Sequence, residues 1–222
     1  MKGMYMLPQV KLRGAWRALT KNLRKETGQR QDTDLYFDPN FAETLETWAI
    51  DNAWREIRFL LGSRKGKVLD LACGTGRAYD FLHDIDGLEY YGCDLSQPLI
   101  DRAVARGIDS NHLLAGDATK LNYDDGMFDF VFSIGSLEHF SQEGLQQAIS
   151  ECRRISRGIN FHQVPVSRSN FDEGWITPYQ SYWNNSESWW MSQFEKIFGK
   201  NVWVMSSKWS DNKSLGAWFI CV

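Results

Sequence analysis

The sequence predicts a three-layer α/β fold, in which a mostly parallel sheet has helices on both faces. Apolar runs of strand length alternate with amphipathic segments of helix length between residues 67 and 165. Such alternation predicts parallel strands that are joined by right-handed crossovers. The apolar runs show little alternation with polar residues, which is typical of strands covered on both faces. The 222 residues correspond to one ordinary domain with a small appendage.

A helical segment precedes the first strand. Asp38 followed by Pro39 is typical of a helix start, and apolar residues at helical spacing continue as far as Gly62. Strands are predicted over residues 67–71, 88–93, 112–115, 128–134 and 159–164, the last of them ended by Pro165. Further helices are predicted over residues 77–83, 96–106 and 143–156.

The segment after Pro165 begins with a loop of roughly twenty residues, and loops of this length are usually functional. Ser186 then opens an amphipathic helix, and residues 201–209 and 215–222 predict a hairpin. We therefore expect two parts, an N-terminal helical cap or extension over residues 1–62 and an α/β domain over residues 63–222.

A glycine-rich turn follows the first strand, within Val68 to Arg77. Gly74 and Gly76 allow the backbone to approach a ligand closely, and the next helix offers unpaired amide groups at its start. Asp70 precedes the turn, where a carboxylate favours a cation and disfavours a pyrophosphate. Tyr79 occupies the position where a dinucleotide-binding turn has Gly or Ala. The turn thus indicates a nucleotide-like ligand that is not a dinucleotide.

Two further acids follow the next two strands. Asp94 ends the second strand, where a carboxylate can accept both hydroxyl groups of a ribose. Asp117 follows the third strand and can accept a hydrogen bond from an exocyclic amine such as that of adenine. Together with Asp70, these acids fit a nucleoside that carries a positive charge and an amino group.

These motifs resemble those of the class I S-adenosylmethionine-dependent methyltransferases. The matching segments are Asp70–Arg77, Tyr91–Ser96, Leu114–Ala118, Phe128–Ser133 and Leu137–His139, in the order that the family has them. The resemblance covers about residues 60–165 and implies a Rossmann-like, seven-stranded sheet with an antiparallel C-terminal hairpin. It implies S-adenosylmethionine as cofactor, with S-adenosylhomocysteine as product. The residues implied to bind it are Asp70, Ala72, Gly74, Gly76, Asp94, Leu95, Asp117, Ala118, Ile134 and Gly135.

The resemblance also implies the chemistry, which is methyl transfer to an O or N atom by in-line displacement. The protein then has to exclude water and align the nucleophile. Where the nucleophile must lose a proton, His139 and His162 are the candidate catalytic bases, with Glu138 as a third. We expect a small-molecule acceptor, or one linked to a sugar or a lipid.

Aromatic residues are concentrated where such an acceptor would bind. The chain has ten Trp, seven of them from Trp175 onward. The residues predicted to contact the acceptor are Trp175, Tyr179, Tyr182 and Trp183. We expect a second group, Tyr36, Trp48 and Trp54, near the methionine end of the cofactor. A third group is expected in the core, namely Trp190, Trp203 and Trp218.

Two other functions remain open on these motifs. A non-catalytic protein on the same fold would keep the cofactor-binding acids and lack turnover. An oxidoreductase that uses a nicotinamide cofactor would share the sheet, although Tyr79 and Asp70 disfavour it.

Composition and charge exclude several classes. With 43% hydrophobic and 24% charged residues the chain is globular, and no apolar run approaches the ~18 residues of a membrane span. The four Cys include no C-x-x-C pair, which disfavours a disulfide scaffold and a Cys-rich zinc module. No group of acids has the pattern of a metal site. Ser133–Ser136 replaces the Asn/Asp-Pro-Pro-Tyr/Phe motif of enzymes that methylate DNA bases, so a nucleic-acid acceptor is not expected.

The net charge of −3 conceals a basic start, because residues 1–30 carry eight Lys or Arg and one Glu. Leu12, Trp16, Leu19 and Leu23 predict an amphipathic helix there. Such a helix could pack on the acidic body, attract an anionic substrate, or meet a nucleic acid or a membrane surface. The start lacks the apolar core of a secretory signal, and we expect a cytoplasmic protein. The oligomeric state is not predicted.

Overall fold

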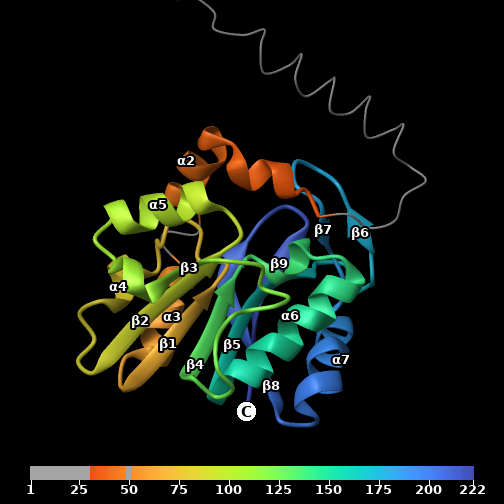
Figure 1. Ribbon diagram of the computed structural model, residues 1–222. Coiled ribbons are helices and arrows are strands. Elements are labelled where there is room, and N and C mark those ends of the chain that lie inside the picture. Colours follow the sequence, from red (N-terminus) through yellow and green to blue (C-terminus); the bar gives the residue numbers. More distant parts are fainter. Residues whose placement is uncertain (1–30, 49–51) are drawn as a thin grey trace, which may run out of the picture. The chain divides into compact units, whose positions relative to one another are not determined.

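The computed structural model describes residues 31–48 and 52–222 (Figure 1). A seven-stranded sheet in the order β3-β2-β1-β4-β5-β9-β8 forms the middle layer. Its strands are β1 (Gly66–Leu71), β2 (Leu88–Asp94), β3 (Leu113–Ala115), β4 (Phe128–Ile134), β5 (Ser156–Ser167), β8 (Val202–Ser210) and β9 (Ser214–Cys221).

The sheet is parallel from β3 to β5 and antiparallel beyond it. β1 pairs with β2 and β4, β2 with β3, and β4 with β5, all in parallel. β9 lies antiparallel to both β5 and β8. The prediction of a mostly parallel seven-stranded sheet with an antiparallel C-terminal hairpin is therefore confirmed. The carboxyl ends of β1, β2 and β4 meet at one edge of the sheet, which parallel pairing requires.

Helices cover both faces of the sheet (Figure 1). On one face α6 and α7 pack on Leu69, Val131 and Val164. On the other, α3, α4 and α5 pack with Val68, Phe130 and Phe132. Successive residues of β1 and β4 thus point to opposite faces of the sheet. Both faces are apolar because helices cover both. The helices are η1 (Thr33–Phe37), α2 (Pro39–Thr47), α3 (Ala53–Leu61), α4 (Tyr79–Leu82), α5 (Gln97–Ala105), η2 (Ser110–His112), η3 (Leu137–His139), α6 (Gln142–Ile155) and α7 (Glu187–Phe198).

Local signals in the sequence start most of these helices. The side chains of Asp38, Ser96, Ser141 and Ser186 each accept a hydrogen bond from a backbone amide of the first turn that follows. Such caps satisfy amide groups that a helix start leaves unpaired. The predicted helix starts after Asp38, Ser96 and Ser186 are confirmed.

One predicted helix is wrong, because the segment expected to run unbroken from Pro39 to Gly62 is two helices. α2 ends at Thr47, and Trp48 takes an extended conformation with ψ of 134°. Asn52 then caps α3 by accepting from the amide of Ala53. The break lets the Trp48 carbonyl accept a hydrogen bond from the indole of Trp54 at 2.8 Å.

The end predicted for the fifth strand is also wrong, because β5 continues through Pro165 to Ser167. The pairing of β4 with β5 ends at Ile134 and Gln163, so beyond that point β5 has only β9 beside it. A proline is tolerated where a strand has a neighbour on one side only.

The long segment after β5 has structure of its own. β6 (Trp175–Ile176) and β7 (Tyr182–Trp183) pair antiparallel as a separate two-stranded sheet. The predicted amphipathic helix around Leu12 to Leu23 lies outside the described residues. The domain boundary at residue 62 stays a prediction, and α3, which precedes it, shares its core cluster with β1 and β4.

Candidate active site

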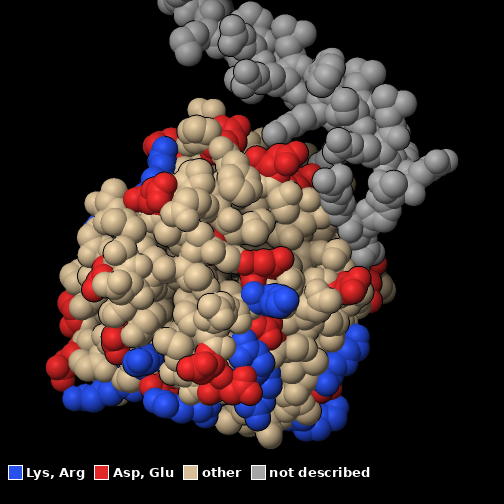
Figure 2. Space-filling model, in the orientation of Figure 1, with Lys and Arg blue, Asp and Glu red and all other residues tan. Residues whose placement is uncertain are grey.

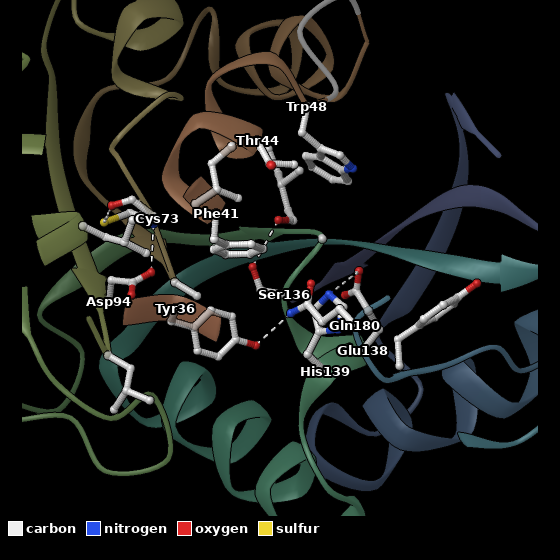
Figure 3. Close-up of a pocket in the computed structure, with 18 of the residues that line it drawn as sticks. Tyr36, Phe41, Thr44, Trp48, Cys73, Asp94, Ser136, Glu138, His139 and Gln180 are labelled. Carbon is white, nitrogen blue, oxygen red and sulfur yellow. Dashed lines mark hydrogen bonds and ion pairs between the residues drawn. The ribbon is translucent and has the colours of Figure 1, made fainter. Parts of the chain in front are cut away.

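A cavity of about 450 Å³ opens at the edge where the carboxyl ends of β1, β2 and β4 meet. It is lined by residues of the glycine turn, of the segments after β2 and β4, and of η1 and α2. Figure 3 shows Asp94 and Cys73 at one end of it, and Glu138, His139 and Gln180 at the other. Ligands of open α/β sheets bind at this edge. The cavity size also lies within the usual range for small-molecule sites, ~300–1,000 Å³.

The glycine turn after β1 forms one wall of the cavity. Gly74 has φ of +56°, and a Cβ there would lie 2.9 Å from the Leu45 side chain of α2. Ala72, which also lines the cavity, has φ of 57°. This conformation is unusual for a residue with a side chain and is often found at functional sites. The turn therefore exposes its backbone to the cavity.

Asp94 connects this turn to the start of α5. Its Oδ2 accepts a hydrogen bond from the amide of Gly74 at 2.9 Å, and its Oδ1 accepts from the amide of Ser96 at 2.9 Å. The carboxyl is only 8% exposed, and burial raises its pKa against the lowering effect of these amides. Each carboxylate oxygen has two lone pairs, so both can still accept a ligand hydroxyl. This arrangement fits the two hydroxyl groups of a ribose.

The neighbouring residues fit a purine ring. Leu95 is 38% exposed beside the cavity, and Ala118 also lines it. Asp117 is exposed, and its Oδ1 accepts from the amide and the hydroxyl of Thr119. These bonds fix the carboxyl at the cavity wall, where it can accept from an amino group.

Most of the residues predicted to bind the cofactor line this cavity: Ala72, Gly74, Asp94, Leu95, Asp117, Ala118, Ile134 and Gly135. Asp70 and Gly76 do not. Asp70 is 2% exposed and accepts a hydrogen bond from the Tyr90 hydroxyl at 2.7 Å. Burial raises its pKa to about 8. A Cβ on Gly76 would lie 2.5 Å from Ile108, so this glycine is needed for packing against the α5 region.

The polar end of the cavity contains Glu138 and His139, both on η3 after β4. The Nδ1 atom of His139 lies 2.8 Å from the Ser181 carbonyl oxygen. Because a carbonyl only accepts, Nδ1 carries the proton and Nε2 has the free lone pair. Burial lowers the pKa of His139 to about 4 and raises that of Glu138 to about 8. At neutral pH both side chains are therefore uncharged.

His162 does not line the cavity, which corrects its prediction as a catalytic base. It is fully buried and stacks on Phe194 of α7 with ring centroids 5.3 Å apart. Its Nδ1 lies 2.9 Å from the Ser133 hydroxyl, and burial lowers its pKa to about 3. His162 is a core residue on the face that α6 and α7 cover.

The four aromatic residues predicted for the acceptor divide into two pairs. Tyr179 and Tyr182 line the cavity. Trp175 and Trp183 do not, because they pair across β6 and β7 with ring centroids 5.3 Å apart. Trp183 is 6% exposed, and its indole donates to the Phe140 carbonyl at 3.0 Å. Trp183 belongs to the core, and the half-buried Trp175 packs against it.

Other aromatic residues complete the lining. Tyr36, Trp48 and Trp54 line the cavity, and so do Phe41 and Trp209. The Trp48 and Trp209 rings lie 5.8 Å apart. Trp209 and Phe41 were missed because nothing in their local pattern shows that the hairpin end and α2 reach the same cavity. Trp190 and Trp218 are fully buried as predicted, whereas Trp203 is 55% exposed on the edge strand β8, so its core assignment is wrong.

Hydrogen bonds connect the roof of the cavity, η1 and α2, to both of its ends. The Ser96 hydroxyl donates to the Tyr36 carbonyl at 2.7 Å, and Gln180 donates to the Tyr36 hydroxyl at 3.0 Å. Arg106 donates to the Thr75 carbonyl at 2.9 Å and also binds Glu46 of α2. The roof therefore rests on the glycine turn, on α5 and on the segment before β7.

Within residues 31–48 and 52–222, no three His, Cys, Asp or Glu side chains are grouped so that they could hold a metal ion. In the same ranges no helix has the length and apolar character needed to cross a membrane.

Residues 68–158 match the family model of a methyltransferase domain. The demethylmenaquinone methyltransferase of Beutenbergia cavernae is 37% identical over 110 residues, which are 49% of this chain and 44% of that protein. The probable tRNA methyltransferase 9B of Bos taurus is 33% identical over 106 residues, 46% of this chain and 22% of that protein. The chain thus spans less than half the length of these curated relatives.

A solved structure matches over nearly the whole chain. It is the 1,6-didemethyltoxoflavin-N1-methyltransferase of Burkholderia thailandensis, with bound 1,6-didemethyltoxoflavin and S-adenosylhomocysteine. The two structures have a TM-score of 0.65 and 15% sequence identity, and the match covers 99% of this chain and 92% of that one. At this identity the likeness shows the shared fold. Residues 68–158 are therefore similar to a methyltransferase domain, and the chain shares its fold with a methyltransferase whose structure contains S-adenosylhomocysteine.

Proposed function

We propose that this protein transfers a methyl group from S-adenosylmethionine to an O or N atom of a small, largely apolar acceptor. The observation that carries the proposal is the shape of one continuous cavity. Residues that fit an adenosine line one end of it, and aromatic side chains with Glu138 and His139 line the other. Such a cavity can hold a cofactor and an acceptor next to each other.

We assign the end of the cavity next to Asp94 to the cofactor because of the contacts described above. Asp94 would accept the ribose hydroxyls, Asp117 the adenine amine, and Leu95 and Ala118 would flank the ring. The backbone at Gly74 and Gly135 would lie along the methionine part. S-adenosylmethionine supplies a methyl group that its sulfonium charge already activates. The residues of this chain then contribute binding, alignment and the exclusion of water.

The charges around the cavity favour a small acceptor over a polyanion such as tRNA. Among the described residues that line it there are four acids, Asp94, Asp117, Asp211 and the neutral Glu138, and one cation, Arg77. The roof helix α2 contains Glu43 and Glu46 and no Lys or Arg. On the face that Figure 2 shows, acidic side chains prevail around α2 and basic ones gather at the opposite end. Acidic surroundings repel phosphate groups.

The aromatic lining favours a flat, apolar acceptor. Three separate segments contribute aromatic side chains to the lining, namely Trp48, Trp209 and the pair Tyr179 and Tyr182. Aromatic walls bind planar rings well and exclude water from the reacting atoms. The polar hydrogen of the acceptor would then lie toward Glu138 and His139, one of which receives the proton that an O–H or N–H group loses.

Titration calorimetry with S-adenosylhomocysteine tests the cofactor half of the proposal. We expect micromolar or tighter binding to the full chain and a loss of at least tenfold in affinity for Asp94→Ala. Methyl transfer from labelled S-adenosylmethionine to 1-naphthol, 1-naphthylamine and bulk tRNA then tests the acceptor class. Absence of S-adenosylhomocysteine binding would overturn the proposed activity, and transfer to tRNA alone would overturn the small-molecule acceptor.

A further inference from the structure

Glu138 is a buried carboxyl whose bonding is incomplete. It is 5% exposed, it lines the acceptor end of the cavity, and its Oε2 has no hydrogen-bond partner within residues 31–48 and 52–222. Buried polar atoms in proteins are nearly always paired, and leaving one unpaired costs ~1–3 kcal/mol. Because Glu138 lines the cavity, a ligand group bound there is the partner that could complete the bonding of this oxygen.

The described groups near Glu138 leave its Oε2 without a partner. His139, on the same element, uses Nδ1 on the Ser181 carbonyl, and its Nε2 lies 3.7 Å from Oε1 of Glu138, beyond hydrogen-bond distance. The Tyr36 hydroxyl of η1 accepts from Gln180. Tyr182 of β7 also interacts electrostatically with Glu138, and its hydroxyl lies 3.4 Å from that of Ser214. Asp32, which interacts with His139, accepts from the Ser181 amide. None of these side chains satisfies Oε2.

We propose that Glu138 is the catalytic base of the methyl transfer and that His139 is a positioning residue. This inference rests on the proposed function. The acceptor's O or N lone pair forms the new bond to the methyl carbon, and the bond from sulfur to that carbon breaks with its electron pair going to sulfur. The proton of the acceptor's O–H or N–H group passes to Oε2 of the Glu138 carboxylate. Charge balances, because the sulfonium and the carboxylate both become neutral.

The placement of η3 supports this assignment. Glu138 and His139 follow β4 directly, with Gly135 and Ser136 forming the turn between them, so the carboxyl lies beside the end of the strand that also flanks the cofactor site. His139 donates to Ser181 in the segment that carries Tyr179 and Tyr182. It thereby fixes the acceptor-binding segment against η3 and sets the position of Glu138.

Basicity also distinguishes the two residues. A general base works best when its pKa lies near the working pH. Burial raises the pKa of Glu138 to about 8, whereas burial lowers that of His139 to about 4. The ionised carboxyl of Glu138 is therefore the stronger base, and it exists in useful amount only as the pH approaches 8. The positive charge of a bound sulfonium lowers this pKa toward neutrality.

The pH dependence of the rate separates the two candidates. With 1-naphthol as acceptor, we expect the rate of the wild type to rise between pH 5.5 and 8.5 and then level. Glu138→Gln should be slower by about 10²–10⁴-fold and lose this rise, in line with the usual contribution of a general base. His139→Asn should keep the rise with a lower plateau. Glu143→Gln makes the same chemical change at an exposed site on α6 and should match the wild type.

A readout without turnover covers the case in which neither naphthyl probe is methylated. The infrared difference spectrum of wild type minus Glu138→Gln, with S-adenosylhomocysteine bound, should contain a protonated-carboxyl band that disappears between about pH 6 and 9. Binding of 1-naphthol to the same complex at pH 8 should weaken at least tenfold in Glu138→Gln. Equal S-adenosylhomocysteine affinity in both proteins shows that the variant is folded.

Three results would overturn the role of Glu138: a wild-type rate that is flat from pH 5.5 to 8.5, a rise that persists in Glu138→Gln, or the absence of both the band and the effect on 1-naphthol binding. Failure of the proposed function looks different. In that case the wild type itself would not bind S-adenosylhomocysteine, whatever residue stands at position 138.

Discussion

The Asp94 carboxylate accepts a hydrogen bond from the amide of Gly74 at 2.9 Å, which joins the end of β2 to the glycine turn after β1. The two residues are twenty positions apart in the chain, with Asp94 at the end of β2 and Gly74 in the turn that follows the neighbouring strand β1. The other oxygen of the same carboxyl accepts a hydrogen bond from the amide of Ser96, the residue that precedes α5. One side chain thus shapes the turn and offers its remaining lone pairs to the cavity.

Replacing Asp94 by Ala should weaken S-adenosylhomocysteine binding by about 10- to 100-fold, because each hydrogen bond to a charged group contributes ~1.5–3 kcal/mol. The loss of the two amide bonds should also lower stability. Asp109→Ala is the matched control, since Asp109 accepts from the Asn111 amide on the exposed η2 turn, outside the cavity. Calorimetry and urea denaturation measure both effects. Equal affinity of Asp94→Ala and Asp109→Ala would contradict the assignment.

Gly135→Ala should destabilise the protein and displace Trp48. Gly135 has φ of +61°, and a Cβ there would lie 2.4 Å from the Trp48 ring. We expect a cost of about 2–4 kcal/mol, of which ~1–2 comes from the left-handed backbone and the rest from the clash. Gly174→Ala, with φ of +78° and nothing within 4 Å, measures the backbone part alone.

Denaturation in urea gives the two costs, and tryptophan fluorescence reports the displaced ring. Adding Trp48→Leu to Gly135→Ala should recover the part that the clash causes. If Gly135→Ala costs no more than Gly174→Ala, the close contact between Trp48 and Gly135 does not exist.

The sequence predicted the fold and the cavity residues at the strand ends better than the aromatic lining, for a physical reason. Asp94, Asp117 and Gly74 follow directly from strand ends, and parallel pairing places all strand ends at one edge. His162 could not be placed this way. β5 is covered on both faces, so its residues have no polar side to show which of them face a ligand.

The aromatic lining depends on contacts between segments that are distant in the chain. Trp209 and Trp48 meet although 161 positions separate them. Trp183 and Tyr182 are adjacent, yet Trp183 packs in the core and Tyr182 lines the cavity. Adjacent residues of a strand point to opposite sides, and the register of β6 with β7 decides which side is buried. No local pattern in the sequence contains that register.

Trp183→Ala and Tyr179→Ala should affect different properties of the protein. Trp183 is 6% exposed and hydrogen-bonded to Phe140, so its removal should cost about 3–5 kcal/mol of stability. Tyr179 is 66% exposed at the cavity mouth, and its removal should change stability by less than ~0.5 kcal/mol.

Urea denaturation measures these costs, and 1-naphthol binding to the S-adenosylhomocysteine complex measures the contribution to the acceptor site. Tyr179→Ala should weaken that binding without a change in stability. The division of the aromatic residues between core and cavity is wrong if Trp183→Ala is as stable as the wild type.

Stability should fall as the pH rises from about 6.5 to 8. Burial raises the pKa of Asp70 and of Glu138 to about 8, whereas an unfolded chain releases these protons near pH ~4. Between these values the folded protein keeps protons that the unfolded chain has lost. Each carboxyl therefore lowers the free energy of unfolding by up to ~1.4 kcal/mol for every unit by which the pH rises in this range.

The histidines act in the opposite direction at lower pH. Burial lowers the pKa of His139 to about 4 and that of His162 to about 3, so raising the pH toward the unfolded value of ~6.5 stabilises the fold. The two effects oppose each other below pH ~6.5, and the carboxyls alone act above it. Asp70→Asn should therefore flatten the decline in urea midpoint between pH 6.5 and 8, while the exposed Asp109→Asn should leave it unchanged. An unaltered decline in Asp70→Asn would show that this carboxyl ionises normally in the folded protein.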